Sequence, residues 1–461
     1  MERTVTVLSR RSAIISLAAL VGLLAGALVA RKTSDAILLC IAIVGVLGLA
    51  MLGERAFPWA VVIVAVAPWY PLIAGSGEVE GPIVKQKVFC AAIAAAALLP
   101  WLWSLALGGR RTRPSRGALL MGVLFGSLGL LIYETNGSAS ELINTKVVGF
   151  LFIGVTFLCA RRFGDGRGWL AASFGGLALL LLMGVYVYLK APSDRVGYFV
   201  GYPITYGALI VGLLPAALLF TSRRSHLLAG AVAVASAALL VFSESRSAWI
   251  AVTVVLVVVV ALQARAGNYR ALAYVASIVV ILAALIVGSG SLHKVIERRL
   301  NSSVASSQSV THREFSYGYA FRNIEQRPIF GAGAPGFSGE ESANKTTIGA
   351  LDNGYLSISV DMGLIGLFAA IIPIGVALRV LGRCLRFGVA PQLELALVLG
   401  IIGMAVVTIF YDSFYWAQID LLLGGMGGVL STRIARIAPV TASAPGLRPA
   451  YGRRARVKLA L

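Results

Sequence analysis

Long apolar blocks alternate with short charged segments along the whole chain. Blocks such as 13–30 and 271–289 come close to the roughly 20 residues that an α-helix needs to cross the hydrocarbon core of a membrane. Helices suit these blocks, because backbone polar groups in lipid must be satisfied within the segment. The runs are continuous, whereas the strands of a membrane β-barrel alternate apolar and polar residues. The pattern therefore predicts an all-α protein, a polytopic bundle of transmembrane helices.

The apolar blocks give about fourteen spans by length. Two blocks, 146–160 and 416–431, are short and a third, 58–75, carries prolines, so twelve or thirteen spans are also compatible with the pattern. The first block follows Arg3, Arg10 and Arg11 but lacks a good cleavage site, and we expect a retained first helix. The predicted spans are 13–30, 36–52, 58–75, 88–107, 117–135, 146–160, 169–189, 204–220, 227–243, 248–264, 271–289, 354–378, 394–411 and 416–431.

Charge predicts which side each loop faces. With the N-terminus in the cytoplasm, most of the 40 Lys and Arg residues fall on the cytoplasmic side, and short loops there, such as 110–116, are densely basic. The C-terminus is then cytoplasmic as well. Phospholipid headgroups account for the net charge of +20 in this arrangement, so we expect membrane lipids and no nucleic acid as partners.

Four regions follow from this map. Helices of residues 1–189 precede a core at 190–378, and helices at 379–431 precede a basic cytoplasmic tail at 432–461. The core contains one large extracytoplasmic loop, 290–353, with short helices. Within this loop, 301–309 is Ser-rich, 312–325 could form an amphipathic helix over the membrane, and the Pro- and Gly-rich run after it predicts turns.

Two segments on the predicted outer face carry arginines. Arg195 precedes a span, where it either snorkels to the interface or holds a phosphate through its forked guanidinium. Tyr198 beside it suits a cavity lining or the aromatic belt of the interface. Arg246 lies between two apolar runs that leave almost no loop, which places it at the membrane edge. There it faces a polar cavity or pairs with an acidic residue such as Glu244.

A third polar group opens the span after the long loop. Asp352, Tyr355 and Ser359 are spaced three and four residues apart and share one helical face. Asp or Asn before an apolar run is also a common N-cap, so capping is the alternative role for Asp352 and Asn353. A carboxylate at a cavity on the membrane edge could instead take the proton of an attacking hydroxyl group. Asp361, inside the apolar run, is costly unless it has a partner.

Sequence motifs of soluble enzymes are absent. The chain has no GxxxxGK[ST], HExxH, CxxC or GxSxG motif, and the Gly-rich run 330–337 is a turn rather than a nucleotide loop. There are three histidines, and the four cysteines lie in or beside predicted spans. We therefore expect no cofactor, no metal site and no disulfide.

The order of these segments resembles the superfamily of O-antigen ligases and Wzy-type polysaccharide polymerases, which are bacterial membrane glycosyltransferases. Four motifs carry the resemblance over roughly 190–370, in the family's order. They are RVGY at 195–198, SRSAW at 245–249, RPIFGAG at 327–333, and DNGYL at 352–356 followed by GLIGL at 363–367. Each motif is weak alone, and the ordered set on one face is more specific.

This resemblance implies a reaction without a nucleotide or a metal. A glycan on undecaprenyl diphosphate moves en bloc to a hydroxyl group of a glycan or glycolipid acceptor, on the outer face of the inner membrane. Carried over to this chain, Arg195 and Arg246 hold the diphosphate and Asp352 acts as the base. The residues expected to bind substrate are Tyr198, Arg313, Arg327, Asn353 and Tyr355.

Asp352 departs from the family's pattern, since its ligases usually have His at this position. Asp followed by Asn is more typical of the polymerases, so a Wzy-type polymerase is the leading prediction. A ligase that joins the glycan to lipid A-core or another surface acceptor is the alternative. A polysaccharide or lipid transporter is more remote, because the spans hold few charges and no internal repeat is evident. Chain-length regulators and other polysaccharide assembly proteins are further partners that the family suggests.

Overall fold

A computed structural model describes the protein at residues 57–68, 153–161, 166–191, 195–265, 316–331, 351–387 and 392–434, apart from single positions, and at scattered positions between 269 and 297. Within these ranges the chain forms helices and no strand, which confirms the prediction of an all-α protein. The predicted spans 13–30, 36–52, 88–107 and 117–135 and the tail after 434 lie outside the described residues.

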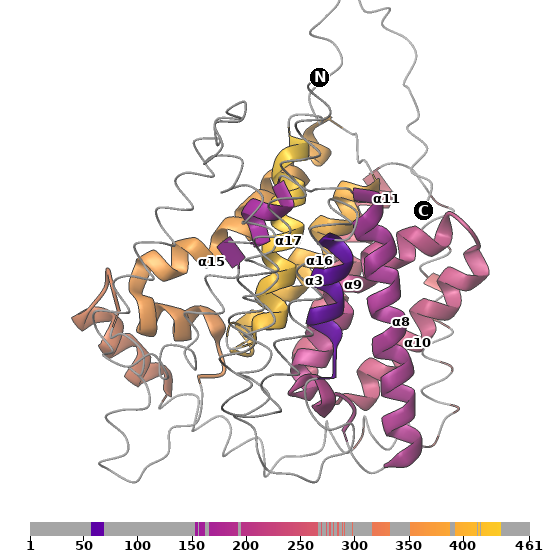
Figure 1. The fold of residues 1–461 in the computed structure, drawn as a ribbon, viewed down its shortest axis with the longest axis horizontal. Coiled ribbons are helices and arrows are strands. Elements are labelled where there is room, and N and C mark those ends of the chain that lie inside the picture. Colours follow the sequence, from indigo (N-terminus) through magenta and orange to yellow (C-terminus); the bar gives the residue numbers. More distant parts are fainter. Residues whose placement is uncertain are drawn as a thin grey trace, which may run out of the picture.

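Most described helices follow the predicted spans. The described helices are α3 (Phe57–Val66), α8 (Gly166–Lys190), α9 (Pro203–Ser222), α10 (His226–Phe242), α11 (Arg246–Arg265), α15 (Gly354–Phe387), α16 (Gln392–Ile409) and α17 (Ala417–Arg433), with the short 3-10 helix η2 (Tyr198–Val200) before α9 (Figure 1). Helix α3 ends at Val66, well inside the predicted span 58–75, and α15 continues past the predicted end at 378. Five of the described helices (α8, α9, α11, α15 and α16) are long and apolar enough to cross a membrane. Together they support a polytopic membrane bundle.

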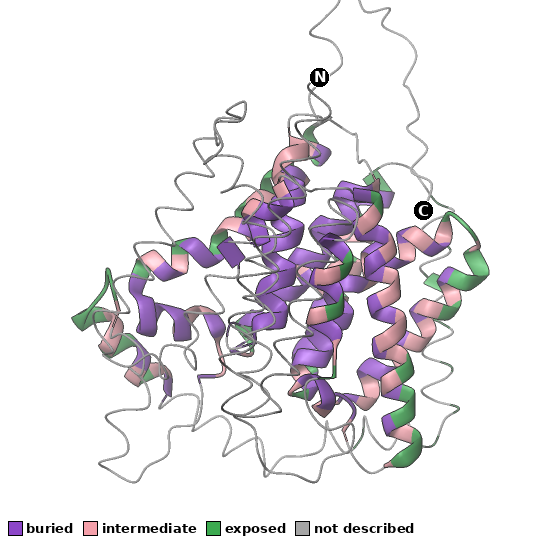
Figure 2. Ribbon diagram, in the orientation of Figure 1, coloured by how far each residue is buried: buried purple, intermediate pink, exposed green. Residues whose placement is uncertain are grey.

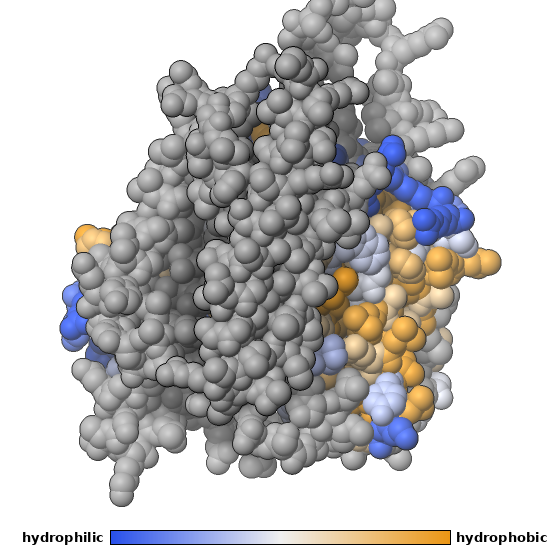
Figure 3. Space-filling model, in the orientation of Figure 1, coloured by the Kyte–Doolittle hydropathy of each residue, from blue (hydrophilic) through white to orange (hydrophobic). Residues whose placement is uncertain are grey.

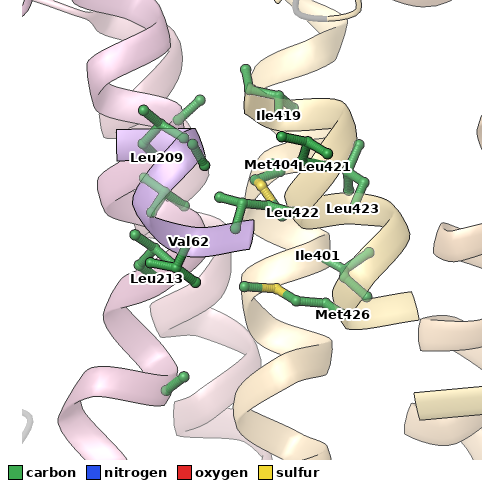
Figure 4. Close-up of a cluster of buried hydrophobic side chains, with 14 of the residues drawn as sticks. Val62, Leu209, Leu213, Ile401, Met404, Ile419, Leu421, Leu422, Leu423 and Met426 are labelled. Atoms are coloured by element: carbon green, nitrogen blue, oxygen red, sulfur yellow. The ribbon is translucent and has the colours of Figure 1, made fainter. Parts of the chain in front are cut away.

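The core lies where α9, α16 and α17 meet, and these are the most completely buried helices (Figure 2). Leu209 and Leu213 of α9 face Met404 of α16 and Leu422 of α17, and the short helix α3 covers them with Val62 (Figure 4). Small residues let α9 and α16 approach closely, because a Cβ atom at Gly400 would overlap the carbonyl oxygen of Gly212.

The outer helices α10 and α11 present apolar side chains on their exposed faces. Leu227 and Val257 are among these exposed residues. In Figure 3 the described part of the surface is a broad apolar area with hydrophilic side chains above and below it. A bundle bounded in this way fits a hydrocarbon layer between two polar interfaces.

The connecting segments gather at the two ends of the bundle. One end, here called the motif end, consists of residues 195–202, 243–246, 351–353 and 410–416. The other, here called the basic end, consists of residues 161, 166–167, 222–225, 383–387, 392–394 and 433–434. The described parts of the predicted outer loops 190–203, 244–247 and 412–415 lie at the motif end, and the described parts of the short basic loops lie at the opposite end.

Helix α15 differs from the single straight span predicted at 354–378. It continues to Phe387, and its backbone leaves the helical conformation at Gly363, with φ 63° and ψ −161°. Two helical pieces therefore share the label α15. The longer C-terminal piece carries Arg379 and Arg386 at exposed positions beyond the predicted end of the span. Long arginine side chains can extend to the membrane interface, so the helix continues past the apolar residues that predicted it.

Candidate functional site

Arg195 joins the loop before α9 to the turn between α10 and α11. Its Nε and Nη2 atoms donate hydrogen bonds to the carbonyl oxygen of Ser243, at 3.3 and 3.1 Å. Nη2 also donates to the carbonyl oxygen of Glu244 at 3.4 Å, and Nε lies 3.8 Å from the carboxylate of Glu244. A backbone bond from Val196 to the carbonyl oxygen of Phe242 reinforces the contact at 3.2 Å. Arg195 thus holds one edge of the turn that carries Arg246.

Glu244 has an unusual backbone in this turn. Its φ of 52° lies in the left-handed region, which costs a residue with a side chain about 1–2 kcal/mol. Glu244, considered above as a partner for Arg246, forms an ion pair with Arg195. Such outliers persist where the surroundings hold them, and they cluster at functional sites.

The SRSAW motif fixes the start of α11 around Arg246. The hydroxyl of Ser245 accepts a hydrogen bond from the backbone of Ala248 at 3.4 Å, in the manner of an N-cap. Ala248 packs on Gly207 of α9, and the indole of Trp249 donates to the carbonyl oxygen of Leu240 at 2.9 Å. Arg246 itself is exposed as the first residue of α11. Its neighbours in the motif therefore fix the first turn of α11, and Arg246 lies exposed at its start.

Asn353 caps α15, which is one of the two roles considered for Asp352 and Asn353. The side-chain oxygen of Asn353 accepts hydrogen bonds from the backbone of Tyr355 and Leu356, at 3.0 and 3.1 Å. Asp352 precedes the cap and is partly exposed at the motif end. Tyr355 points into the bundle, where its hydroxyl donates to the carbonyl oxygen of Ala405 at 3.1 Å. The N-cap role considered for this pair is therefore filled at least by Asn353.

A second carboxylate, that of Asp412, lies beside the first turn of α15. Asp412 is buried in the loop between α16 and α17, and its Oδ2 atom accepts a hydrogen bond from the hydroxyl of Ser357 at 2.9 Å. This bond ties the first turn of α15 to the loop 410–416. Asp361 is buried further along α15, immediately before the break at Gly363.

The two glycine motifs of the sequence meet at this break. The backbone N–H groups of Leu364 and Ile365 donate to the carbonyl oxygens of Pro328 and Ile329, at 2.8 and 3.4 Å. The turn at 327–331 thus supplies acceptors to N–H groups that the interruption leaves without a helical partner. A side chain at Gly363 would overlap the Ile329 carbonyl, and Gly331, also at positive φ, lies equally close to the backbone of Asp361.

The segment before this turn forms the helix 316–326, which confirms part of the helix predicted at 312–325. Tyr317, Ala320 and Ile324 pack against Leu351 and Val360. The segment is thereby fixed to the start of α15 at two places. Arg327 is exposed at the beginning of the turn, whereas Arg313 lies outside the described residues.

Aromatic residues that no sequence pattern groups together complete the motif end. Tyr198 and Tyr202 lie beside the loop 410–416, where Tyr202 stacks on Tyr411. The hydroxyl of Tyr411 accepts a hydrogen bond from the indole of Trp416 and shares another with Thr205 at 3.5 Å. Burial raises the pKa of Tyr411 above the ordinary range of a phenol, so this hydroxyl stays protonated. Aromatic side chains are common at membrane interfaces, which hides such a cluster in the sequence.

Titratable residues do not gather into a metal-binding group at this end. Among the residues that the structure describes, no three His, Cys, Asp or Glu side chains lie close enough together to hold an ion. Cys159 and Cys384 are buried free thiols.

A known protein family matches part of this arrangement. Residues 231–371 match the family described as O-antigen ligase. This part of the chain is similar to an O-antigen ligase domain. This match confirms the resemblance drawn from the four motifs, and it supports a membrane glycosyltransferase of the O-antigen ligase type. A comparison with curated proteins finds no match.

The O-antigen ligase domain supplies only part of the motif end. It contains Arg246 and Asp352, together with the turn that docks on the break in α15. Arg195 and the loop 410–416 lie outside the matched residues and pack against them through the contacts of Ser243 and Ser357. The candidate site is therefore built from the domain and from segments on both sides of it.

Proposed function

We propose that the protein transfers a glycan en bloc from undecaprenyl diphosphate to an acceptor hydroxyl group, on the outer face of the inner membrane, and that it acts as a Wzy-type polymerase. The observation that carries this proposal is the clamp of Arg195 on the turn before Arg246. It brings two arginines from separate loops to the end of the bundle that also presents Asp352. A lipid-linked diphosphate needs such a site at a membrane edge, with cations beside a potential base.

The chemistry assigned to these residues is a displacement at the anomeric carbon. The acceptor hydroxyl forms the new C–O bond, the bond to the diphosphate oxygen breaks, and its electron pair stays on the leaving diphosphate. Arg246 stabilises that charge, and Asp352 takes the proton of the hydroxyl group. Among the described residues, the contacts of Arg195 use Nε and Nη2, which leaves Nη1 for a phosphate oxygen.

Polymerase and ligase differ in the acceptor. Asp352 favours the polymerase, since family ligases usually carry His there, whereas the description of the matched family favours a ligase. Purified protein mixed with lipid-linked oligosaccharide distinguishes them. A longer lipid-linked glycan supports the polymerase, and glycan joined to lipid A-core supports the ligase. If the wild-type protein transfers glycan to neither acceptor, the proposal is wrong.

Arginine variants test the role of the motif end in the same assay. Arg246→Lys keeps the charge but loses the forked guanidinium, so turnover should fall about tenfold or more. The matched control is Arg223→Lys at the basic end, where the exposed Arg223 donates to Gln392 at 3.1 Å. The control should keep normal turnover. Equal losses in both variants, or full turnover in Arg246→Ala, would contradict the assignment.

The side of the membrane is tested by single cysteines in a chain whose four native cysteines are replaced by serine. Gly318→Cys lies on helix 316–326 with open space around its Cβ, and His226→Cys lies at the exposed start of α10 near the basic end. In intact spheroplasts an impermeant thiol reagent should label position 318 alone. Labelling of position 226 alone would reverse the two ends and reject an outer-face site.

A further inference from the structure

Three tyrosines at the motif end form an ordered group with one ring exposed at the surface of the bundle. Tyr202 keeps 39% of its surface exposed. Its ring stacks on Tyr411, with centroids 6.1 Å apart and planes at 13°, and Tyr198 meets it edge-on at 5.9 Å and 81°. An exposed aromatic ring backed by a second ring offers a flat apolar surface of defined orientation.

The backbone beneath this group is closely fixed. Gly201, at φ 114°, lies against the ring of Trp416, where any side chain would overlap the indole. The amide of Gln418 donates to the carbonyl oxygen of Val200 at 2.9 Å, and Trp416 donates to the hydroxyl of Tyr411. The group of three tyrosines is therefore held in place before any ligand binds, which lowers the entropy cost of binding.

The position of the rings indicates the class of ligand. Tyr198 lies three residues after Arg195, and Tyr411 directly precedes Asp412, so the apolar rings have charged neighbours along both segments. A pyranose ring matches such a surface, because its C–H groups carry partial positive charge and its hydroxyl groups point outward from the ring. The face of an aromatic ring is electron-rich and attracts such C–H groups.

We propose that Tyr202, backed by Tyr411 and flanked by Tyr198, is a stacking platform for a sugar ring of the glycan. This inference rests on the proposed function, since it assigns a glycan subsite beside the arginines and Asp352. The sugar belongs either to the donor glycan or to the acceptor glycan, which share the same chemistry. The three tyrosines lie outside the matched domain at 231–371, so that match assigns no role to them.

Three substitutions of Tyr202 separate stacking from other effects. Tyr202→Ala should raise the KM for one glycan substrate about tenfold, in the range of other ring-stacking contacts, with little change in kcat. Tyr202→Phe should stay near the wild type, because it keeps the ring. Tyr202→Leu should resemble Tyr202→Ala, because it is apolar but has no aromatic face. Measuring KM separately for the lipid-linked donor and for a lipid-free oligosaccharide acceptor shows which glycan uses the platform.

Tyr186 provides the matched control, because it is an exposed tyrosine whose place the aromatic belt of a membrane interface would explain. It is 45% exposed and lies near the end of α8 that leads into the motif end. Tyr186→Ala should leave both KM values unchanged, and the melting temperature of each variant checks the fold. Normal KM values in Tyr202→Leu, or equal changes in Tyr202→Ala and Tyr186→Ala, would overturn the platform.

Binding without turnover keeps this test independent of the proposed function. The probe is the oligosaccharide released by mild acid from the lipid-linked donor, followed by saturation-transfer NMR with the protein in nanodiscs. Binding that Tyr202→Ala abolishes, in a protein that transfers nothing, would support the platform and reject the transferase. Transfer and binding that are both unaffected by Tyr202→Ala and Tyr202→Leu would reject the platform and leave the transferase standing.

Discussion

The two ends of the bundle satisfy their polar groups in different ways. At the basic end charged side chains meet close partners: Arg433 lies 2.9 Å from Glu394, and Arg383 donates to the carbonyl oxygen of Ile434 at 2.6 Å. At the motif end Arg195 stands 3.8 Å from Glu244 and contacts mainly backbone oxygens. Close pairing ties helices together, whereas the looser contact leaves part of a guanidinium for a ligand.

We expect this difference to separate anchoring from chemistry. The pair at the basic end is well shielded, with 18% and 6% of the side chains of Arg433 and Glu394 exposed. The pair at the motif end is more open, at 22% for Arg195 and 14% for Glu244. Breaking the ion pair at the basic end should therefore change stability, and substitutions of charged residues at the motif end should change turnover.

The largest expected effect is at Asp352. Asp352→Asn should lower turnover about 10²-fold or more, because an amide cannot accept the proton of the attacking hydroxyl. Its melting temperature should stay unchanged, since Asn353 caps α15. The control Asn353→Ala should lose about 1 kcal/mol of stability. Wild-type turnover in Asp352→Asn would exclude Asp352 as the base and leave Asp412 and Asp361 as the candidates.

Breaking the pair at the basic end should come next in size. Glu394→Gln leaves Arg433 without its anionic partner and should lower the free energy of unfolding by about 3 kcal/mol, at the lower end for buried pairs. Turnover per folded molecule should not change. Thermal unfolding in detergent, together with the transfer assay, measures both quantities. A loss of turnover at full stability would contradict the division of the two ends.

The break in α15 offers a smaller, local effect. Gly363→Ala places a Cβ atom against the Ile329 carbonyl at a positive φ, and this strain should cost about 1–3 kcal/mol of stability. Detachment of the turn 327–331 would relieve the strain. Limited proteolysis near 316–331 should then become faster. Gly375→Ala in the same helix is the control, because open space surrounds that position. Equal proteolysis of both variants would show that the docked turn does not depend on Gly363.

The smallest effect is expected at Glu244. Glu244→Gln removes the anion beside Arg195, and a partly exposed pair contributes about 1 kcal/mol at most. The KM for the lipid-linked donor should fall by a few-fold, since the diphosphate no longer competes with the carboxylate. Glu325→Gln, an exposed glutamate of helix 316–326, should leave KM unchanged. A higher KM in Glu244→Gln would mean that this carboxylate orients Arg195 for binding.

The sequence predicted the helices well and the site only in outline. Apolar runs determined α9, α10 and α11 to within two residues at most ends, because lipid imposes a length on each span. The break at Gly363 was missed, since a continuous apolar run gives no sign of it and its acceptors come from Pro328 and Ile329, far earlier in the chain. The roles of Tyr411 and Trp416 depend on contacts with the loop at 195–202, which no local pattern encodes.

The contacts of Arg195 determine which positions of this turn can vary between related chains. Its hydrogen bonds end on the carbonyl oxygens of positions 243 and 244, and the neighbouring bond from Val196 ends on that of 242. Every amino acid carries that oxygen, so related chains can exchange residues along the turn and still assemble it. Position 195 has no such freedom, because lysine has no planar fork to span two carbonyls.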